Sequence, residues 1–378
     1  MTGEVAPAGG SLPVEQSVEH DPSPEAIPTG CAVEARLQYM DGLRGVAIAS
    51  VILYHVYARW PAIVPLPYGS RYAPVFGWGW LGVELFFMIS GFLIFRTLER
   101  CQSFPRFLHK RWQRLFPGML AATVLIFATA SLIDRPLGPP SPSEAVAGLS
   151  FIDPRFLAAI GGPDQMLEGT FWSLFVEVKF YILAGATYFA LGRKWALMGL
   201  VGAFSVFWLC RPLNIQESQA WAFLLDVPYW AWFATGALFH EWTRMGDRRL
   251  FAAALVVGAI ASAAPVPGVR QIPNMEWAPF AGLPFVLLFA TALVSENAQR
   301  LLSHQWLLFL GFISYPLYLL HEQAVVGLSL QLSRGVGHGW LPWMIPMLPI
   351  IVVCAVSWAV AKRIEPAARA GYLMLARS

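Results

Sequence analysis

Residues 78–97 read WGWLGVELFFMISGFLIFRT and decide the fold. A helix that crosses a lipid bilayer needs about 20 mostly apolar residues. This stretch supplies them, with one carboxylate, Glu84, in its first half. We interpret it as a membrane span, and we expect Glu84 to have a structural or functional reason for lying in it.

The composition of the whole chain agrees with this interpretation. Of its 378 residues, 57% are hydrophobic and 13% are charged, and the mean hydropathy is +0.54. Soluble domains carry roughly twice that share of charged residues, so lipid is the expected solvent. We predict an all-α polytopic membrane helix bundle of about ten transmembrane helices, without a soluble catalytic domain. The predicted spans are residues 42–60, 78–97, 117–134, 170–191, 195–210, 227–243, 250–266, 278–295, 306–326 and 341–362.

The two ends of the chain differ from its middle. Residues 1–38 are rich in Pro, Gly, Glu and Ser and contain no apolar run, which is typical of disordered segments. We predict a disordered cytoplasmic tail at 1–38, a transmembrane domain at 39–370 and a short cytoplasmic tail at 371–378. Residues 145–162 are partly apolar but interrupted by charges, and we interpret them as an interfacial or re-entrant piece.

The positions of the basic residues support this span count. Cytoplasmic loops of membrane proteins carry an excess of Lys and Arg, and the loop between the second and third spans is strongly basic. With ten spans, both termini lie on the same side as this loop, and most other basic residues join them there. We predict an integral protein of the bacterial cytoplasmic (inner) membrane with both termini in the cytoplasm. The net charge of +3 is too small to indicate a nucleic-acid partner.

Ionisable side chains inside the predicted spans are the candidate functional residues. Each such charge costs roughly 2.5–3.5 kcal/mol on insertion scales, so it needs a partner or a role. The residues are Asp41, Arg44, His55, Glu84, Glu177, Lys179, His321 and Glu322.

Arg44 and His55 share the first span. They are eleven residues apart, which is about three helical turns, so both are expected on one face of the helix, about 16 Å apart along its axis. An anion-binding group and a titratable base would then line one path. In the alternative interpretation, Arg44 reaches the lipid headgroups and His55 makes an interhelical hydrogen bond. Asp41 is interpreted chiefly as the N-cap of this helix.

Glu177 is predicted to meet His55, because both lie in the outer halves of their spans. A carboxylate beside the imidazole would orient the ring and favour its charged form. The alternative is a structural cluster of Glu177 with Lys179, although residues two apart on a helix do not face each other. His321 is expected to form a second polar wall.

Arg111 and Arg114 precede the third span at its cytoplasmic mouth. They are three residues apart and therefore neighbours on a helix. Paired guanidinium groups suit phosphate, although a basic stretch at this position is also a common topology signal or lipid contact.

These features occur together in an order that resembles the acyltransferase-3 family of bacterial membrane O-acyltransferases. The spacing of Arg44 and His55, an Arg, ten residues and a His, is similar to the family's first-helix motif. Further similar blocks are residues 79–94, the Arg-x-x-Arg pattern of 111–117, 171–181, 313–321 and 364–366. The resemblance covers residues 39–369. The chain departs from the family pattern at Glu84, where Asp is commoner, and at Lys179.

The resemblance implies an acyl-coenzyme A donor, with acetyl as the expected group, and a saccharide or glycosylated acceptor. Membrane lipids are expected as further partners of the protein. His55 would act as general base and Glu177 would orient it, while Arg44, Arg111 and Arg114 would bind the donor's phosphates. Substrate-binding or supporting roles are expected for Asp41, Glu84, Trp172, Ser173, Tyr181, Tyr315 and His321. No His, Cys or acidic residues show the spacing of metal ligands, so no metal is predicted. The oligomeric state stays open, with a homodimer as one option.

Two other function classes would also keep charges inside the membrane. A proton- or solute-coupled transporter often shows internal repeats and broken helices, and the sequence shows neither clearly. A structural or flippase-like lipid protein would need neither the Arg44–His55 alignment nor the arginine pair.

Overall fold

The computed structural model describes residues 31–210, 224–264, 279–335 and 341–368, and these residues form helices joined by turns and loops, with no strand among them. The predicted all-α class is therefore confirmed. The predicted tails at 1–38 and 371–378 lie largely outside the described residues.

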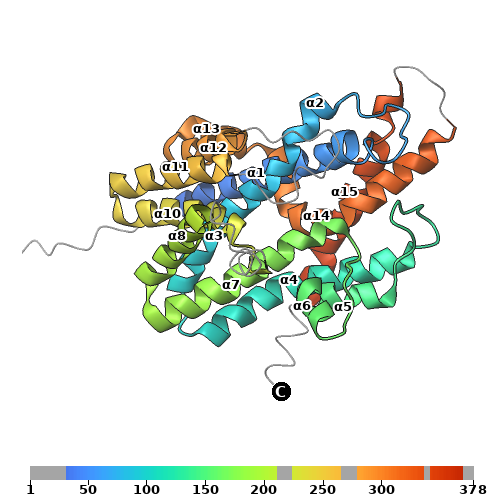
Figure 1. Ribbon diagram of the computed structural model, residues 1–378. Helices are drawn as coiled ribbons and strands as arrows, with labels where there is room; N and C mark the ends of the chain where they lie inside the picture. The colour runs from blue at the N-terminus through green and yellow to red at the C-terminus, as the bar shows by residue number, and fades with distance from the viewer. Residues whose placement is uncertain (1–30, 211–223, 265–278, 336–340, 369–378) are drawn as a thin grey trace, which may run out of the picture.

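The helices follow one another along the chain (Figure 1). They are α1 (Cys31–Tyr54) with η1 (His55–Arg59), α2 (Ala73–Phe76), η2 (Gly77–Leu81), α3 (Gly82–Glu99), α4 (Phe104–Ala128), α5 (Pro142–Ser150), α6 (Pro154–Ala159), η3 (Gly169–Phe171), α7 (Trp172–Leu191), α8 (Arg193–Cys210), η5 (Val227–Tyr229), α10 (Trp230–Met245), α11 (Arg248–Ala263), α12 (Leu283–Val294), α13 (Glu296–Leu302), α14 (Gln305–Ser333), η7 (Leu341–Met344), α15 (Met347–Ala359) and η8 (Val360–Ile364).

The predicted count of about ten membrane spans is not confirmed. A helix occupies the described part of every predicted span. Four stretches of the described residues are long and apolar enough to cross a membrane, and they are Ala73–Glu99, Gly169–Leu191, Arg193–Cys210 and Pro342–Ala368. The pair α12 and α13, bent by 109°, would make a fifth. Helices α10 and α11 have 16 residues each, about 24 Å, which is short of a hydrocarbon core of about 30 Å.

Helix α1 lies in the middle of the bundle. It packs along α14 and α3, while α3 also packs on α10, and α10 on α11 (Figure 1). The sequence permits this because glycines stand at the crossings. A Cβ at Gly311 of α14 would lie 1.9 Å from the carbonyl oxygen of Asp41 in α1. A Cβ at Gly91 of α3 would lie 2.0 Å from the carbonyl oxygen of Phe233 in α10.

The α3–α10 crossing gives a stability prediction. Gly91→Ala forces the two backbones apart, and overpacking of this kind costs about 1–3 kcal/mol. We expect a lower thermal unfolding midpoint for the purified protein. Gly199→Ala in α8 is the matched control, because nothing lies within 4 Å of its Cβ position. Equal midpoints for the two variants would contradict this packing.

Asp41 is not a helix N-cap, so that prediction is wrong. Helix α1 already begins at Cys31 and continues through Asp41 without a break. The Asp41 carboxylate instead accepts a hydrogen bond from Nη1 of Arg44, at 2.6 Å. The reason is that α1 extends well beyond its apolar part, which hydropathy alone could not indicate.

Residues 145–162 form two short helices, α5 and α6, and the chain turns between them. Phe151 has a left-handed backbone (φ 57°), and Asp153 caps α6 by accepting from the amide of Arg155 at 2.9 Å. The predicted interruption by charged residues thus coincides with the break between the helices.

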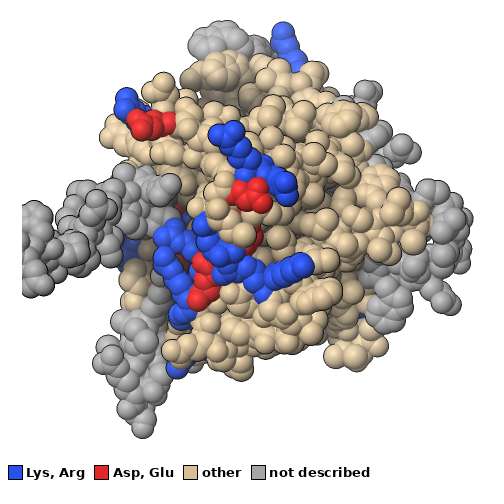
Figure 2. Space-filling view, turned by 90° about the vertical axis from the view of Figure 1, so that its left-hand side faces the viewer, with Lys and Arg blue, Asp and Glu red and all other residues tan. Residues whose placement is uncertain are grey.

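Charged side chains gather on one face of the molecule. Figure 2 shows Lys and Arg side chains clustered there, with a few acidic side chains between them and uncharged surface around them. The junction of α10 and α11 lies on this face, at the left of Figure 1. This is the face that the distribution of basic residues assigns to the cytoplasm, and that orientation stays a prediction.

Candidate active site

His55 stands where α1 ends and a π-helical turn begins. Such π turns are rare, and they occur frequently at functional sites. The His55 side chain faces α14, where His321 and Glu322 lie side by side. Nε2 of His321 is 3.3 Å from Nδ1 of His55, and Oε1 of Glu322 is 3.7 Å from Nε2 of His55.

The hydrogen bonds assign the protons of both rings. The carbonyl oxygen of Val51 lies 2.8 Å from Nδ1 of His55 and can only accept, so Nδ1 is the donor. His321 directs its own Nδ1 at the carbonyls of Leu317 and Tyr318, at 3.2 and 3.0 Å. Nε2 of neutral His55 therefore carries a lone pair, and this nitrogen is the one that lies 3.7 Å from Glu322. The arrangement is that of a base with a carboxylate beside it.

Glu322 is held by the turn that precedes α7. Its carboxylate is 5% exposed and accepts from the backbone amide of Thr170 at 2.8 Å. A Cβ at Gly169 would lie 2.8 Å from the same carboxylate, so a side chain there would displace the carboxylate. Sequence reasoning counted Glu322 among the intramembrane charges but gave it no role. Its position directly after His321 was the available signal.

A second group of polar residues lines a cavity of about 90 Å³ beside this pair. The cavity gathers residues that the sequence singled out from four separate segments. Those among its lining residues are Arg44, Arg111, Arg114, Ser173, Glu177, Tyr181 and Tyr315. The structure therefore brings the three predicted phosphate-binding arginines to one place.

Glu177 lies in this arginine-lined cavity and not beside His55. Its Oε1 accepts from Oγ of Ser90 and from the hydroxyl of Tyr181, each at 2.5 Å. The prediction assumed that Glu177 and His55 lie at the same depth in the membrane. Thr170, which binds Glu322, is the residue of this segment that lies level with His55. Glu177 is seven residues, or about 10 Å, further along the helix. The carboxylate beside His55 is that of Glu322.

The arginines have few partners of their own among the described residues. Nη2 of Arg111 reaches Oγ1 of Thr97 at 3.4 Å, and its buried Nε has no hydrogen-bond partner in that part of the chain. The guanidinium of Arg111 also lies 5.9 Å from the ring centroid of Tyr181. Buried donors without partners are rare in proteins, so an anionic ligand would complete this group. Arg114 is exposed at the mouth of the cavity.

Ser173 and Tyr318 connect the cavity to the histidine pair. Both line the cavity, and their hydroxyl oxygens are 2.8 Å apart. The ring of Tyr318 lies 5.7 Å from that of His321. Tyr315, one turn earlier on α14, donates to the carbonyl of Leu115 at 2.6 Å and so fixes α14 against α4.

The remaining predicted residues lie around these groups. Glu84 is buried in α3, and its Oε2 has no hydrogen-bond partner within the described ranges. The ring of Trp172 packs between Phe87 and Tyr229, with centroids 6.2 and 5.1 Å away. Lys179 turns away from Glu177 and forms ion pairs with Asp153 and Asp226.

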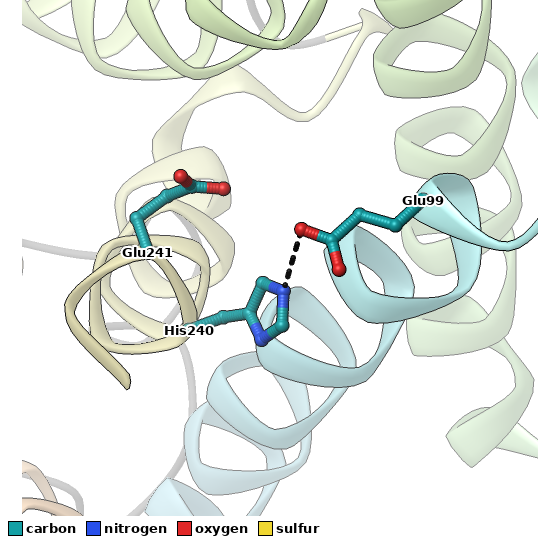
Figure 3. A group of neighbouring side chains, drawn as sticks. All are labelled: Glu99, His240 and Glu241. Carbon is teal, nitrogen blue, oxygen red and sulfur yellow. Dashed lines mark ion pairs between the residues drawn. The ribbon is translucent and has the colours of Figure 1, made fainter. Parts of the chain in front are cut away.

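Glu99, His240 and Glu241 form a group that sequence spacing did not indicate (Figure 3). Their ligand atoms lie within 4.8 Å of one another, as in a metal site, and His240 of α10 points at Glu99 of α3, with 3.3 Å between Nε2 and Oε1. However, Arg193 pairs with Glu99, and Arg244 pairs with Glu241 at 2.9 Å. These two guanidinium groups already balance the two carboxylates, so the group needs no cation.

Comparison with known proteins gives consistent matches. A family described as an acyltransferase domain matches residues 37–362. Nodulation protein 10 of Rhizobium leguminosarum bv. viciae is 25% identical over 339 residues, which cover 78% of this chain and 84% of that protein. Peptidoglycan O-acetyltransferase OatA of Listeria monocytogenes is 25% identical over 158 residues, covering 38% of this chain and 23% of that protein.

O-acetyltransferase OatA of Staphylococcus aureus (strain NCTC 8325 / PS 47) is 29% identical over 157 residues, again 38% of this chain and 23% of that protein. The matched part of the chain thus spans less than a quarter of the length of these O-acetyltransferases. No solved structure matches the chain.

Proposed function

Since the chain belongs to the acyltransferase domain family and is an acyltransferase, we propose that it moves an acyl group, with acetyl expected, from acyl-coenzyme A to a hydroxyl of a saccharide. The relatives named as O-acetyltransferases, one of them acting on peptidoglycan, support an acetyl group and a polysaccharide acceptor. A transporter is not favoured, because the family's activity is acyl transfer.

One observation carries the proposal. Three arginines from α1 and α4 line a single cavity, and Ser173 and Tyr318 line it too; the Tyr318 ring lies 5.7 Å from that of His321, which contacts His55. A donor with phosphates at one end and a thioester at the other has that order of chemical groups. The arginines would bind its phosphates, and its pantetheine arm would extend toward His55.

His55 would act as general base on the acceptor. Nε2 takes the proton of the acceptor hydroxyl, and the oxygen forms a bond with the thioester carbonyl carbon. The carbon–sulfur bond then breaks, and the sulfur leaves with the proton returned by the imidazolium. The transient positive charge of His55 is stabilised by Glu322, while the Val51 carbonyl keeps the ring in its reactive tautomer.

Glu177 receives a different role from the one that the sequence suggested. With its hydrogen bonds from Ser90 and Tyr181, it places a negative charge among the arginines and holds the cavity wall in position. We propose that it positions the donor-binding arginines rather than the base.

Arg111 provides a test of the donor site. Arg111→Ala should raise KM for acetyl-coenzyme A by roughly 10- to 100-fold, the range for losing hydrogen bonds to a charged group. Steady-state kinetics in detergent would measure it. Arg106→Ala is the matched control, because Arg106 is exposed on the same helix and pairs with Gln102. The proposed donor site is refuted if both variants have the same KM for acetyl-coenzyme A.

The proposed reaction is tested with labelled acetyl-coenzyme A and glycan strands released from peptidoglycan. Membranes containing the protein should transfer label to the strands in an alkali-labile, ester-bound form. Label that stays in the thioester, or is released only as acetate, would contradict the proposed function.

A further inference from the structure

A second cavity, of about 280 Å³, opens beside α7 and has no role in the chemistry described above. It lies between the α5–α6 region and the start of α10. Its lining residues are Asp153, Pro154, Arg155, Asp164, Met166, Trp172, Phe175, Asp226, Pro228 and Tyr229.

One wall of this cavity is aromatic. The rings of Trp172 and Tyr229 lie 5.1 Å apart at 43°, and both side chains are partly exposed. Behind them, the ring of Phe87 contacts both, with its centroid 5.6 Å from that of Tyr229. Phe87 lines the arginine-lined cavity, so its ring lies between that cavity and the aromatic wall of the second one.

The other wall is polar and carries balanced charge. Nζ of Lys179 lies 2.6 Å from Asp153 and 2.5 Å from Asp226. The guanidinium of Arg155 pairs with the same two carboxylates, at 2.6 and 2.9 Å, and stays 34% exposed. Two cations and two anions therefore offer many hydrogen-bonding groups without a net charge.

Asp153 in this wall keeps its charge over the physiological range. Burial raises the pKa of Asp153, but hydrogen bonds from Arg155 and Lys179 lower it more strongly, to about 2. Asp164 adds one exposed carboxylate at the rim. A neutral ligand rich in hydroxyls fits this surface better than an anion does.

We propose that this cavity is the acceptor subsite, in which a neutral sugar ring packs on Trp172 and Tyr229 while its hydroxyls bond to the Asp153–Arg155–Asp226 wall. The inference rests on the proposed function and names the substrate class that this part of the site takes.

One short segment supports the placement. The turn that leads into α7 carries Thr170, whose amide holds Glu322 beside His55. Two residues later Trp172 faces the second cavity, and Ser173 faces the arginine-lined cavity. Base, acceptor and donor would thus meet around four consecutive residues, 170–173.

Direct binding measurements test the subsite. The purified full chain is titrated with a tetramer of N-acetylglucosamine as a neutral probe, and with a galacturonic acid tetramer as an anionic one. Tyr229→Ala should weaken binding of the neutral tetramer by roughly tenfold, the upper range for a lost aromatic contact. Tyr229→Phe keeps the ring and should bind as the wild type does. Trp195→Ala, an exposed residue of α8, is the control.

A second variant covers the case in which Tyr229→Ala fails to fold. Asp164→Asn changes only an exposed rim residue and should narrow the preference for the neutral tetramer over the anionic one. The subsite is overturned if the wild type binds neither tetramer, or if folded Tyr229→Ala binds the neutral tetramer like the wild type; should that variant not fold, an unchanged preference in Asp164→Asn overturns it.

Turnover measured on the same preparations separates this inference from the proposed function. If the wild type transfers acetyl groups to glycan strands and Tyr229→Ala binds the neutral tetramer with an unchanged Kd, the subsite is refuted and the proposed reaction is not. Tyr229-dependent binding without any transfer would keep the cavity as a saccharide site and refute the reaction.

Discussion

His55→Ala is expected to lower kcat for acyl transfer by roughly 10²- to 10⁴-fold, the usual contribution of a general base. The reason is local, because Nε2 of His55 has a lone pair fixed by the Val51 carbonyl and lies 3.7 Å from Glu322. His321 Nε2 faces the Nδ1 side of the His55 ring, so it does not occupy the position of the reacting nitrogen. Transfer of labelled acetyl groups in purified membranes measures the effect.

The control for this variant is His304→Ala. His304 is exposed at the start of α14 and makes no side-chain cap hydrogen bond. It should transfer at the wild-type rate. Wild-type turnover by His55→Ala, at equal expression and thermal stability, would remove His55 from the mechanism.

Glu322→Gln is expected to lower kcat by roughly 10- to 100-fold while KM for acetyl-coenzyme A stays unchanged. Glutamine preserves the acceptor for the Thr170 amide, so the fold around the turn should survive. What it removes is the negative charge 3.7 Å from Nε2 of His55, which stabilises the imidazolium. Steady-state kinetics with both substrates varied separates the two constants.

A purely structural role for Glu322 would give a different result. Stability would then fall together with activity, and Glu322→Asp would not restore kcat. Glu296→Gln, at an exposed i,i+4 pair with Arg300, is the matched control and should change neither constant.

The helical class could be predicted from the sequence, and three arginines that line one cavity could be selected from it, for physical reasons. Apolar runs and intramembrane charges are visible in one dimension, and an Arg-x-x-Arg spacing is a property of a single helix. Arg44, Arg111 and Arg114 could therefore be selected from residue type and spacing alone, and the structure places all three on one cavity.

Pairings between helices were harder to predict. Whether His55 faces Glu177 or Glu322 depends on how far α7 and α14 slide along α1, and a shift of about 10 Å exchanges one carboxylate for the other. At the α1–α14 crossing, Gly311 lies against Asp41, and the two residues are far apart in the sequence. The Asp153–Lys179–Asp226 network was missed for the same reason, since its members come from three separate segments.

The number of membrane spans was also difficult to predict from the sequence. Each predicted span contains a helix. However, α10 packs on α11 and on α3, so part of its apolar surface faces other helices. Hydropathy does not distinguish a helix buried in protein from one that faces lipid. The four stretches that pass by length and composition are the part that the structure supports.

The central claim is that the arginine-lined cavity and His55 belong to one path for an acyl donor. The most direct measurement is a structure of the His55→Ala variant with acetyl-coenzyme A bound. The account predicts the phosphates against Arg111 and Arg114, and the thioester carbonyl between Ser173 and residue 55. Phosphates bound elsewhere, or a thioester on the far side of Tyr318 from residue 55, would contradict it.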